Sequence, residues 1–168
     1  NKKLILVTGH RRENFGEGLK NICEAIKVIS TKEVQVIYVV HLNPNVKKTV
    51  SKILKNVNDV HLLQPLDYFK FVYLMEKSYF ILTDSGGIQE EAPSLNKPVL
   101  VMRDKTERPE ALKTGAIKLV GTSKKKIIKE SFLLLDDEKK YNLMAKKENP
   151  YGDGKSSKRI LNIIKDLK

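Results

Sequence analysis

Six short apolar runs recur along the chain and constrain its fold more than any other feature. They lie at residues 4–7, 34–40, 60–63, 80–83, 98–101 and 116–120. Most are continuously apolar and are separated by amphipathic stretches, best seen at Leu19, Ile22, Cys23, Ile26 and Ile29. Continuous runs indicate strands that are buried on both faces. The pattern predicts an α/β fold: a Rossmann-like, doubly wound parallel sheet of six strands.

The end of the chain contains no further strand-like run. It predicts helices at residues 126–134, 136–147 and 156–168. We expect the first two to pack on the flank of the sheet. The last has an apolar face with helical spacing, made by Ile160, Leu161, Ile163, Ile164 and Leu167.

The size of the chain predicts a single domain over residues 1–168. This length suffices for one well-formed core and is too short for two ordinary α/β domains. A composition with 40% hydrophobic and 31% charged residues is typical of a soluble globular protein. No apolar run approaches the roughly 20 residues that cross a bilayer, and the amino terminus shows no signal-peptide pattern. We therefore expect a cytoplasmic protein with no membrane partner.

The charge and the cysteine content exclude further classes. A net charge of +12 can indicate a nucleic-acid partner. The lysines are scattered, however, and show none of the basic and aromatic alternation of an RNA-binding surface. We expect no nucleic-acid partner. The single cysteine, Cys23, cannot form an internal disulfide and lies on an apolar helical face, which predicts a small buried side chain.

A glycine-rich turn follows the fourth apolar run. Gly86 and Gly87 allow close approach of an anion, Ser85 offers a hydroxyl, and a helix that begins near Ile88 would direct backbone N–H groups at the ligand. Glu91, in the first turn of that helix, would accept hydrogen bonds from the hydroxyls of a ribose. The turn predicts a nucleoside diphosphate site. The alternative is an ordinary corner between a strand and a helix.

A second polar cluster follows the first apolar run. His10, Arg11 and Arg12 place an imidazole and two guanidinium groups at the carboxyl end of a strand. Ligands of open α/β sheets bind at that edge. Near neutral pH an imidazolium could donate a proton to a departing nucleotide, and the alternative is a structural histidine at a strand end.

Five segments resemble the non-hydrolysing UDP-N-acetylglucosamine 2-epimerases. They are residues 8–14 (TGHRREN), 40–45 (VHLNPN), 83–91 (TDSGGIQEE), 103–110 (RDKTERPE) and 149–154 (NPYGDG). They occur in order across nearly the whole chain. The resemblance covers the carboxyl-terminal half of the family's two-domain, glycosyltransferase-B-like architecture. It implies that the amino-terminal domain, which carries most of the family's catalytic carboxylates, is absent from this chain.

The resemblance implies an isomerase that interconverts UDP-N-acetylglucosamine and UDP-N-acetylmannosamine. UDP would be eliminated across carbons one and two of the sugar and added back with the opposite configuration at carbon two. No cofactor and no metal ion is expected. The family further implies a homodimer at full length, a terminal helix that reaches the missing amino-terminal domain, and a role in bacterial envelope polysaccharides. Alone, this chain is expected to bind UDP and not to epimerise.

The resemblance assigns a catalytic role to His10, which would assist the departure of UDP. It also implies that Arg11 and His41 contact a second, allosteric UDP-N-acetylglucosamine molecule. The substrate-binding set that it implies is Leu66, Phe71, Ser85, Gly86, Gly87, Glu91 and Arg108.

Within that set, Leu66 and Phe71 would lie near the uracil and Glu91 at the ribose. Ser85, Gly86 and Gly87 would hold the diphosphate, and the Arg108 guanidinium would bind phosphate or sugar oxygens. For Phe71, helical core packing remains an alternative, and for Arg108 a solvated ion pair.

Two other function classes remain open. The carboxyl-terminal domain of a glycosyltransferase would share the sheet and the ribose-binding acid. It is not expected to combine the strings at residues 10–14 and 103–110. A nucleic-acid-binding protein driven by charge would lose affinity steeply with salt and would ignore free UDP.

Overall fold

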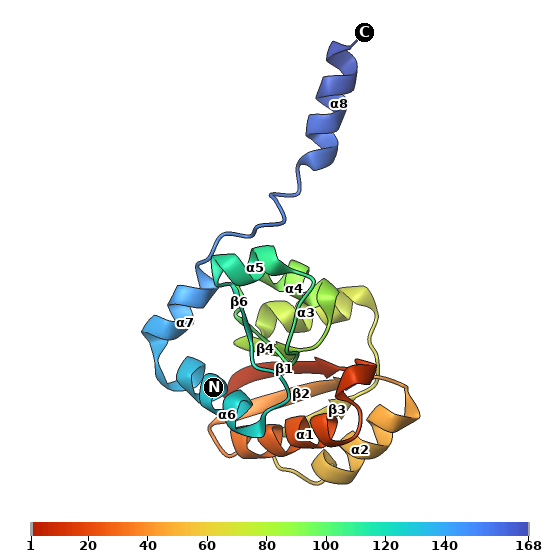
Figure 1. The fold of residues 1–168 in the computed structure, drawn as a ribbon, viewed down its shortest axis with the longest axis vertical. Helices are drawn as coiled ribbons and strands as arrows, with labels where there is room; N and C mark the ends of the chain where they lie inside the picture. Colours follow the sequence, from red (N-terminus) through yellow and green to blue (C-terminus); the bar gives the residue numbers. More distant parts are fainter. Residues whose placement is uncertain (1, 168) are drawn as a thin grey trace.

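The computed structural model describes residues 2–167 and contains one six-stranded sheet (Figure 1). The strands lie in the order β3-β2-β1-β4-β5-β6, and every neighbouring pair is parallel. Their bounds are β1 Lys3–Gly9, β2 Val34–Val40, β3 Val60–Leu63, β4 Phe80–Thr83, β5 Val99–Val101 and β6 Ile117–Leu119. This order is that of a doubly wound Rossmann-like sheet. The fold predicted from the apolar runs is confirmed.

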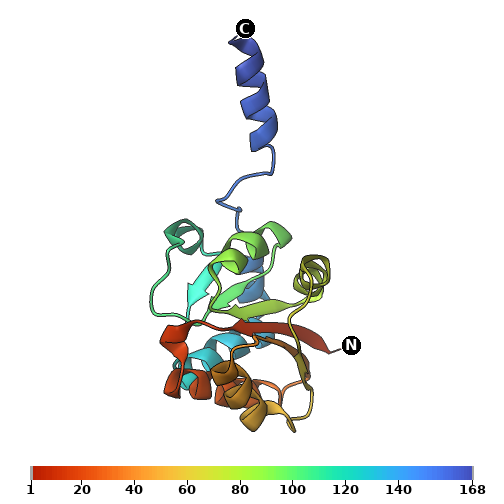
Figure 2. The same ribbon diagram turned by 90° about the vertical axis from the view of Figure 1, so that its right-hand side faces the viewer.

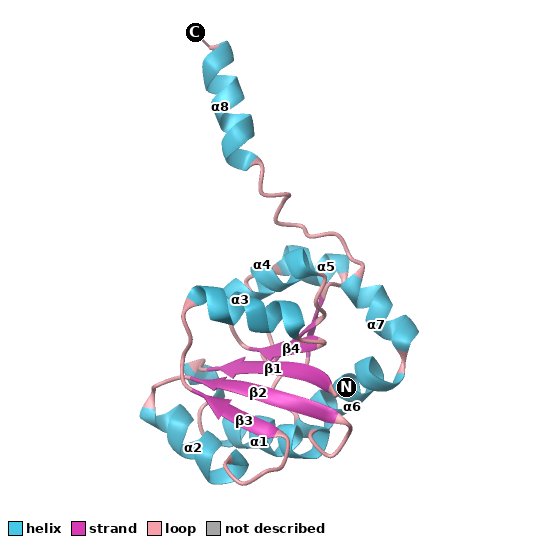
Figure 3. Cartoon of the chain, turned by 180° about the vertical axis from the view of Figure 1, so that it is seen from behind, coloured by secondary structure: helices cyan, strands magenta, loops and turns pink. Residues whose placement is uncertain are grey.

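Helices cover both faces of the sheet (Figures 2 and 3). One face packs against α1 (Glu17–Ile29), α2 (Pro44–Leu54) and α6 (Lys124–Asp136). The other packs against α3 (Tyr68–Lys77), α4 (Gly86–Glu91) and α5 (Pro109–Thr114). Two 3-10 turns, η1 (Arg12–Asn14) and η2 (Ala92–Leu95), complete the connections, and α7 (Glu138–Ala145) contacts α6.

Alternation along β1 explains the two cores. Ile5 and Val7 point into the cluster under α1, whereas Leu6 points into the cluster under α3 and α4. All three are fully buried. A central parallel strand needs apolar residues on both faces because helices cover both, and this is why its sequence does not alternate.

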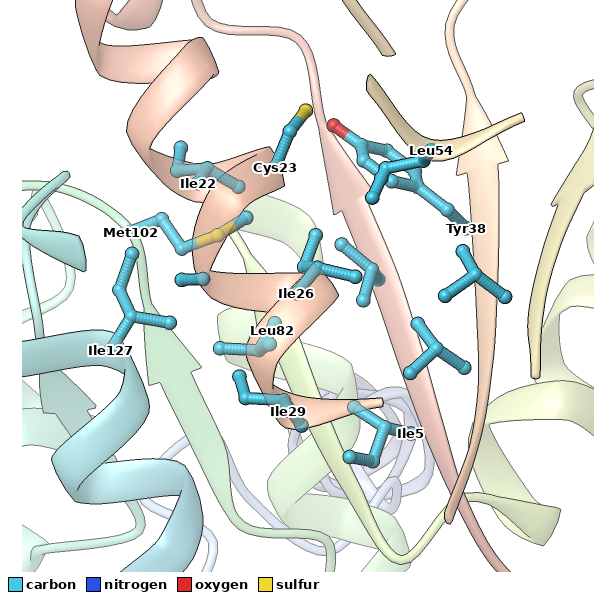
Figure 4. Packing of buried hydrophobic residues seen from close by; sticks show 14 of the residues in the cluster. Ile5, Ile22, Cys23, Ile26, Ile29, Tyr38, Leu54, Leu82, Met102 and Ile127 are labelled. Atoms are coloured by element: carbon cyan, nitrogen blue, oxygen red, sulfur yellow. The ribbon is translucent and has the colours of Figure 1, made fainter. Parts of the chain in front are cut away.

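Cys23 lies in the larger core, beside Ile22 and Ile26 of α1 and close to Tyr38 of β2 (Figure 4). It is fully buried, as predicted. Burial, with a smaller contribution from the charge of Glu24, raises the pKa of its thiol to about 12. A thiol in this environment stays protonated at neutral pH and is a packing residue.

The last helix, α8 (Ser156–Asp166), stands away from the rest of the chain in both perpendicular views (Figures 1 and 2). None of its residues is buried, and Ile160 is 57% exposed. The apolar face predicted there is present, and it covers no part of residues 2–155. By contrast, α6 and α7 pack beside the sheet as expected. Within the described part of the chain, no helix has the length and apolar character that a membrane span needs.

A matched pair of substitutions separates the core from α8. Ile26→Ala removes a fully buried side chain of α1 and should lower the free energy of unfolding by about 2–5 kcal/mol. The same change at the exposed Ile160 should alter it by less than about 0.5 kcal/mol. Urea denaturation of both variants measures the difference. Equal losses would show that α8 is packed in solution.

Candidate functional site

The segments that carried the predicted site meet at the carboxyl ends of the strands. Residues 10–16 follow β1, residues 84–85 follow β4, and residues 102–108 follow β5. These three strands are neighbours in the order β1-β4-β5, so their parallel ends meet at one edge of the sheet. Segments far apart in sequence are thereby brought together at the edge where open α/β sheets bind ligands.

The carboxylate of Asp84 connects the loops after β1 and β4. Asp84 is 1% exposed and accepts hydrogen bonds from the backbone N–H of His10 at 3.0 Å and of Arg11 at 2.9 Å. It also accepts one from Asn14 Nδ2 at 3.0 Å, whose amide donates to Met102 O as well. A buried carboxylate needs such donors to offset its desolvation. This one therefore joins the β1, β4 and β5 loops in one network.

The turn after β4 differs from its predicted form in one respect. We expected the helix to begin near Ile88, but α4 begins at Gly86. Ser85 takes an extended backbone, with φ −78° and ψ 134°, at the N-cap position, so both glycines enter the first helical turn. Glu91 consequently ends α4 and does not lie in its first turn. Gly87 is exposed at the surface of the turn, while Gly86 is buried beneath two arginine side chains.

Two guanidinium groups converge on Gly86. A β-carbon at this position would lie 3.6 Å from Arg11 Nη2 and 3.9 Å from Arg108 Nη2. Each guanidinium is oriented by its Nε, which donates to Asp84 O in Arg11 and to the Glu90 carboxylate in Arg108. With Nε engaged in both side chains, one Nη2 atom of each guanidinium lies close to Gly86. This arrangement favours an anion with several oxygens.

Carboxylates surround this pair of cations and are themselves engaged. Glu90 forms an ion pair with Arg108 and raises the pKa of its guanidinium. Glu91 accepts a hydrogen bond from the Tyr68 hydroxyl at 3.2 Å, and its charge raises the pKa of that phenol. An oxygen of Glu91 lies 3.8 Å from the position of a β-carbon on Gly87, which keeps it beside the glycine turn.

Arg103 links the loops after β1 and β5. It is 7% exposed and donates to Glu13 at 2.6 Å and to Glu107 at 2.6 Å. Hydrogen bonding to Arg103 lowers the pKa of Glu107 to about 2. The pairing fixes residue 107 of the loop, directly before Arg108, to the start of the same loop at Arg103.

His10 lies beside this network and stacks on His41. Their ring centroids are 5.1 Å apart with an interplanar angle of 18°. His10 Nδ1 is 3.7 Å from the Asp84 carboxylate, and His41 Nδ1 accepts a hydrogen bond from the N–H of Asn43. A shallow hollow of about 440 Å³ is lined by His10, Arg11, Arg12, Glu13, His41 and Asn43. Ser85, Glu91 and Arg108 do not line it.

Comparison with known proteins identifies the family of this chain. The UDP-N-acetylglucosamine 2-epimerase family matches residues 1–165. The chain belongs to this family. A UDP-N-acetylglucosamine 2-epimerase of Campylobacter jejuni is 59% identical over 166 residues, which cover 98% of this chain and 43% of the relative. The chain thus spans less than half the length of this curated relative.

Solved structures of this epimerase family resemble the whole chain. The Neisseria meningitidis UDP-GlcNAc 2-epimerase bound to UDP-GlcNAc superposes with a TM-score of 0.93 at 51% identity, covering 99% of this chain and 45% of its own. The Methanocaldococcus jannaschii UDP-GlcNAc 2-epimerase in complex with UDP-GlcNAc and UDP gives a TM-score of 0.80 at 36% identity. That match covers 98% of this chain and 45% of its own.

The predicted uracil contacts of this epimerase-family chain lie before and on α3. Leu66 precedes α3 and Phe71 lies on its first turns, and both are partly buried against the smaller core cluster. Phe71 therefore packs in the core, as the alternative interpretation proposed, while part of it remains accessible. Its contact with a base stays a prediction.

Five residues that hold the site together had no predicted role. These residues are Asn14, Asp84, Gln89, Arg103 and Thr106. Asp84 had a detectable signal, because a carboxylate that directly follows a fully apolar strand must find hydrogen-bond donors at the strand end. The partners of Gln89 and Arg103 have no such signal, since they lie 4 to 90 residues away in sequence.

Replacing Asp84 tests its role as the junction. Asp84→Asn keeps the shape of the side chain but turns an amide N–H toward a backbone donor. We expect the free energy of unfolding to fall by about 1–3 kcal/mol. The control is Asp166→Asn on the exposed α8, which makes the same chemical change and should shift stability by less than about 0.5 kcal/mol. Urea denaturation compares the two variants. Equal losses of stability would contradict the role of Asp84 in joining the loops.

Proposed function

We propose that this chain is the UDP-sugar-binding part of a UDP-N-acetylglucosamine 2-epimerase. In this proposal the complete enzyme interconverts UDP-N-acetylglucosamine and UDP-N-acetylmannosamine by elimination and re-addition of UDP. The observation that carries the proposal is the convergence of Arg11 Nη2 and Arg108 Nη2 on Gly86. The Neisseria meningitidis and Methanocaldococcus jannaschii structures of similar proteins, bound to UDP-GlcNAc, support the choice of nucleotide.

The charges suit a leaving diphosphate. When the bond between sugar and UDP breaks, negative charge develops on the diphosphate, and donors that are already oriented stabilise it without reorganising. Arg11 and Arg108 are held by their Nε bonds, so their Nη2 groups are in place before the nucleotide arrives. Ser85 and the backbone of Gly86 and Gly87 would complete the cradle, and Glu91 would bind the ribose hydroxyls.

His10 would act at the sugar side of the diphosphate. Its backbone N–H is fixed by Asp84, and its ring lies at the same edge as Arg11. Protonated, it would donate to the departing UDP, and neutral, it would take that proton back on re-addition. Arg11 and His41 also line the hollow beside His10, which supports their proposed contact with a second UDP-N-acetylglucosamine molecule.

Removal of the carbon-two proton needs a carboxylate that is available as a base. The carboxylates near Gly86 are engaged: Asp84 with loop N–H groups, Glu90 with Arg108 and Glu91 with Tyr68. We therefore propose that the base comes from a further domain of the complete enzyme, against which the apolar face of α8 packs. A homodimer, which rests on the family resemblance, and a cytoplasmic location, which rests on the apolar pattern of the sequence, belong to the same proposal.

Gly86→Ala tests the anion site without disturbing the fold. The added methyl group meets the two Nη2 atoms at ordinary contact distances, and alanine in a helix is about 0.5–1 kcal/mol more favourable than glycine. The variant should therefore keep its stability. It should bind UDP at least about tenfold more weakly, because the methyl group would enter the space proposed for the diphosphate beside the two Nη2 atoms. Calorimetric titration with UDP measures the affinity.

The matched control for the titration is Lys125→Ala. It removes one positive charge from the exposed surface of α6 and should leave UDP affinity within about twofold. A short oligonucleotide, titrated at physiological salt, should not bind. Unchanged UDP affinity in Gly86→Ala would place the nucleotide elsewhere. Strong oligonucleotide binding that falls steeply with salt would favour the nucleic-acid alternative instead.

The isolated chain is expected to bind UDP without epimerising the sugar nucleotide. These 168 residues, purified by themselves, should bind UDP and form no UDP-N-acetylmannosamine from UDP-N-acetylglucosamine. The sugar products can be separated by chromatography, and exchange of the carbon-two proton with deuterated water can be followed by NMR. Epimerisation at a rate comparable with that of full-length relatives would show that the chain contains its own base.

A further inference from the structure

We propose that Gln89 is a positioning residue that fixes Arg108 relative to the Ser85-Gly86-Gly87 turn. The inference rests on the proposed function, since it concerns the same nucleotide site. Gln89 is fully buried on α4, one turn after Ser85. No ligand role is proposed for its side chain. It acts on the site through the residues to which it is bonded.

Both ends of the Gln89 amide are engaged. Nε2 donates to Ser85 O at 3.0 Å, and Oε1 accepts from Thr106 Oγ1 at 2.5 Å. The orientation of this amide follows from chemistry, because a carbonyl oxygen can only accept and so must face the NH₂ group. Thr106 then has to donate its single hydroxyl proton to Oε1.

Thr106 continues the chain of bonds to Arg108. Its Oγ1 accepts from the backbone N–H of Arg108 at 3.0 Å, and a backbone N–H can only donate. The hydroxyl therefore has one arrangement that satisfies both neighbours. Three directed hydrogen bonds connect the backbone of residue 108 to the backbone of residue 85 through Gln89.

This connection matters because Arg108 stands on a loop. Its backbone, at φ −122° and ψ 62°, is not helical, and no side chain caps α5 at this position. Arg103 anchors the start of the same loop through Glu107, but that ion pair leads to Glu13 and the β1 loop. Of these two anchors, the Gln89 bond is the one that leads to the glycine turn.

The bond from Nε to Glu90 orients the Arg108 guanidinium, and the loop sets the backbone from which the side chain extends. Arg108 Nη2 lies 3.9 Å from the β-carbon position on Gly86, so a small shift of the loop removes it from the proposed diphosphate position. Displacements of about 1 Å are enough to weaken such contacts strongly. Gln89→Met preserves the approximate volume of the side chain and removes both of its hydrogen bonds.

A double-mutant cycle tests the mechanism. We expect Gln89→Met to bind UDP about tenfold more weakly than the original chain. If Gln89 acts through Arg108, the double variant Gln89→Met/Arg108→Ala should bind UDP as weakly as Arg108→Ala alone, to within about twofold. Thr106→Val should reproduce the loss, and Thr106→Ser, which keeps the hydroxyl, should recover affinity.

The control is Ser78→Ala. Ser78 is 1% exposed at the opposite end of β4, and its hydroxyl donates to Met75 O at 2.7 Å. The change removes a buried hydrogen bond and should lower stability without changing UDP affinity. This comparison separates positioning from a general loss of stability. Unchanged UDP affinity in Gln89→Met would overturn the inference. So would a double variant whose loss of UDP affinity equals the product of the losses in the two single variants.

Hydrogen exchange supplies a readout that does not involve nucleotide. The Arg108 amide should exchange at least about tenfold faster in Gln89→Met than in Ser78→Ala. The reason is that its acceptor, Thr106 Oγ1, no longer has its hydrogen bond to Gln89. Equal exchange in both variants would overturn the inference. A chain with no measurable affinity for UDP would instead overturn the proposed function, and the exchange rate would still decide the role of Gln89.

Discussion

The buried carboxylate of Asp84 is the interaction on which the site depends. It lies where β4 ends beside β1, and its oxygens accept from two backbone N–H groups and one amide of the neighbouring loop. A charge at this depth is stable only while those donors remain in place. The loop that carries His10 and Arg11 is therefore fixed to the turn that carries Ser85, and the two polar clusters act as one unit.

Around this junction, ion pairs and hydrogen bonds fix the direction of each arginine. Arg103 is bound on both sides by carboxylates, which leaves it a role in joining loops. Arg11 and Arg108 are bound at Nε and keep Nη2 directed at Gly86. The three arginines thus have different roles, because they differ in burial and in the number of nitrogens that are hydrogen-bonded. In our proposal, the hydrogen bonds of Gln89 and Thr106 fix the position of the Arg108 backbone.

The core of this chain is covered by helices, whereas the proposed site and α8 are exposed. Both faces of the sheet are covered by helices, and the central strands are fully buried. The proposed nucleotide site lies at an open edge, and α8 presents its apolar face to solvent. The chain spans less than half the length of its curated relatives. In the proposed function, the open edge and the apolar face of α8 would both be covered by a further domain of the complete enzyme.

The amino-acid sequence by itself determined the parallel sheet, the burial of Cys23 and the family, because hydrophobic periodicity and local motifs are properties of neighbouring residues. It also predicted that residues 10–14 and 85–91 would share one edge. The tertiary structure decided where α4 begins, how Asp84 is satisfied and which atoms of Arg11 and Arg108 face Gly86. Those outcomes depend on hydrogen bonds between residues up to 74 positions apart, which only the packing of the sheet brings together.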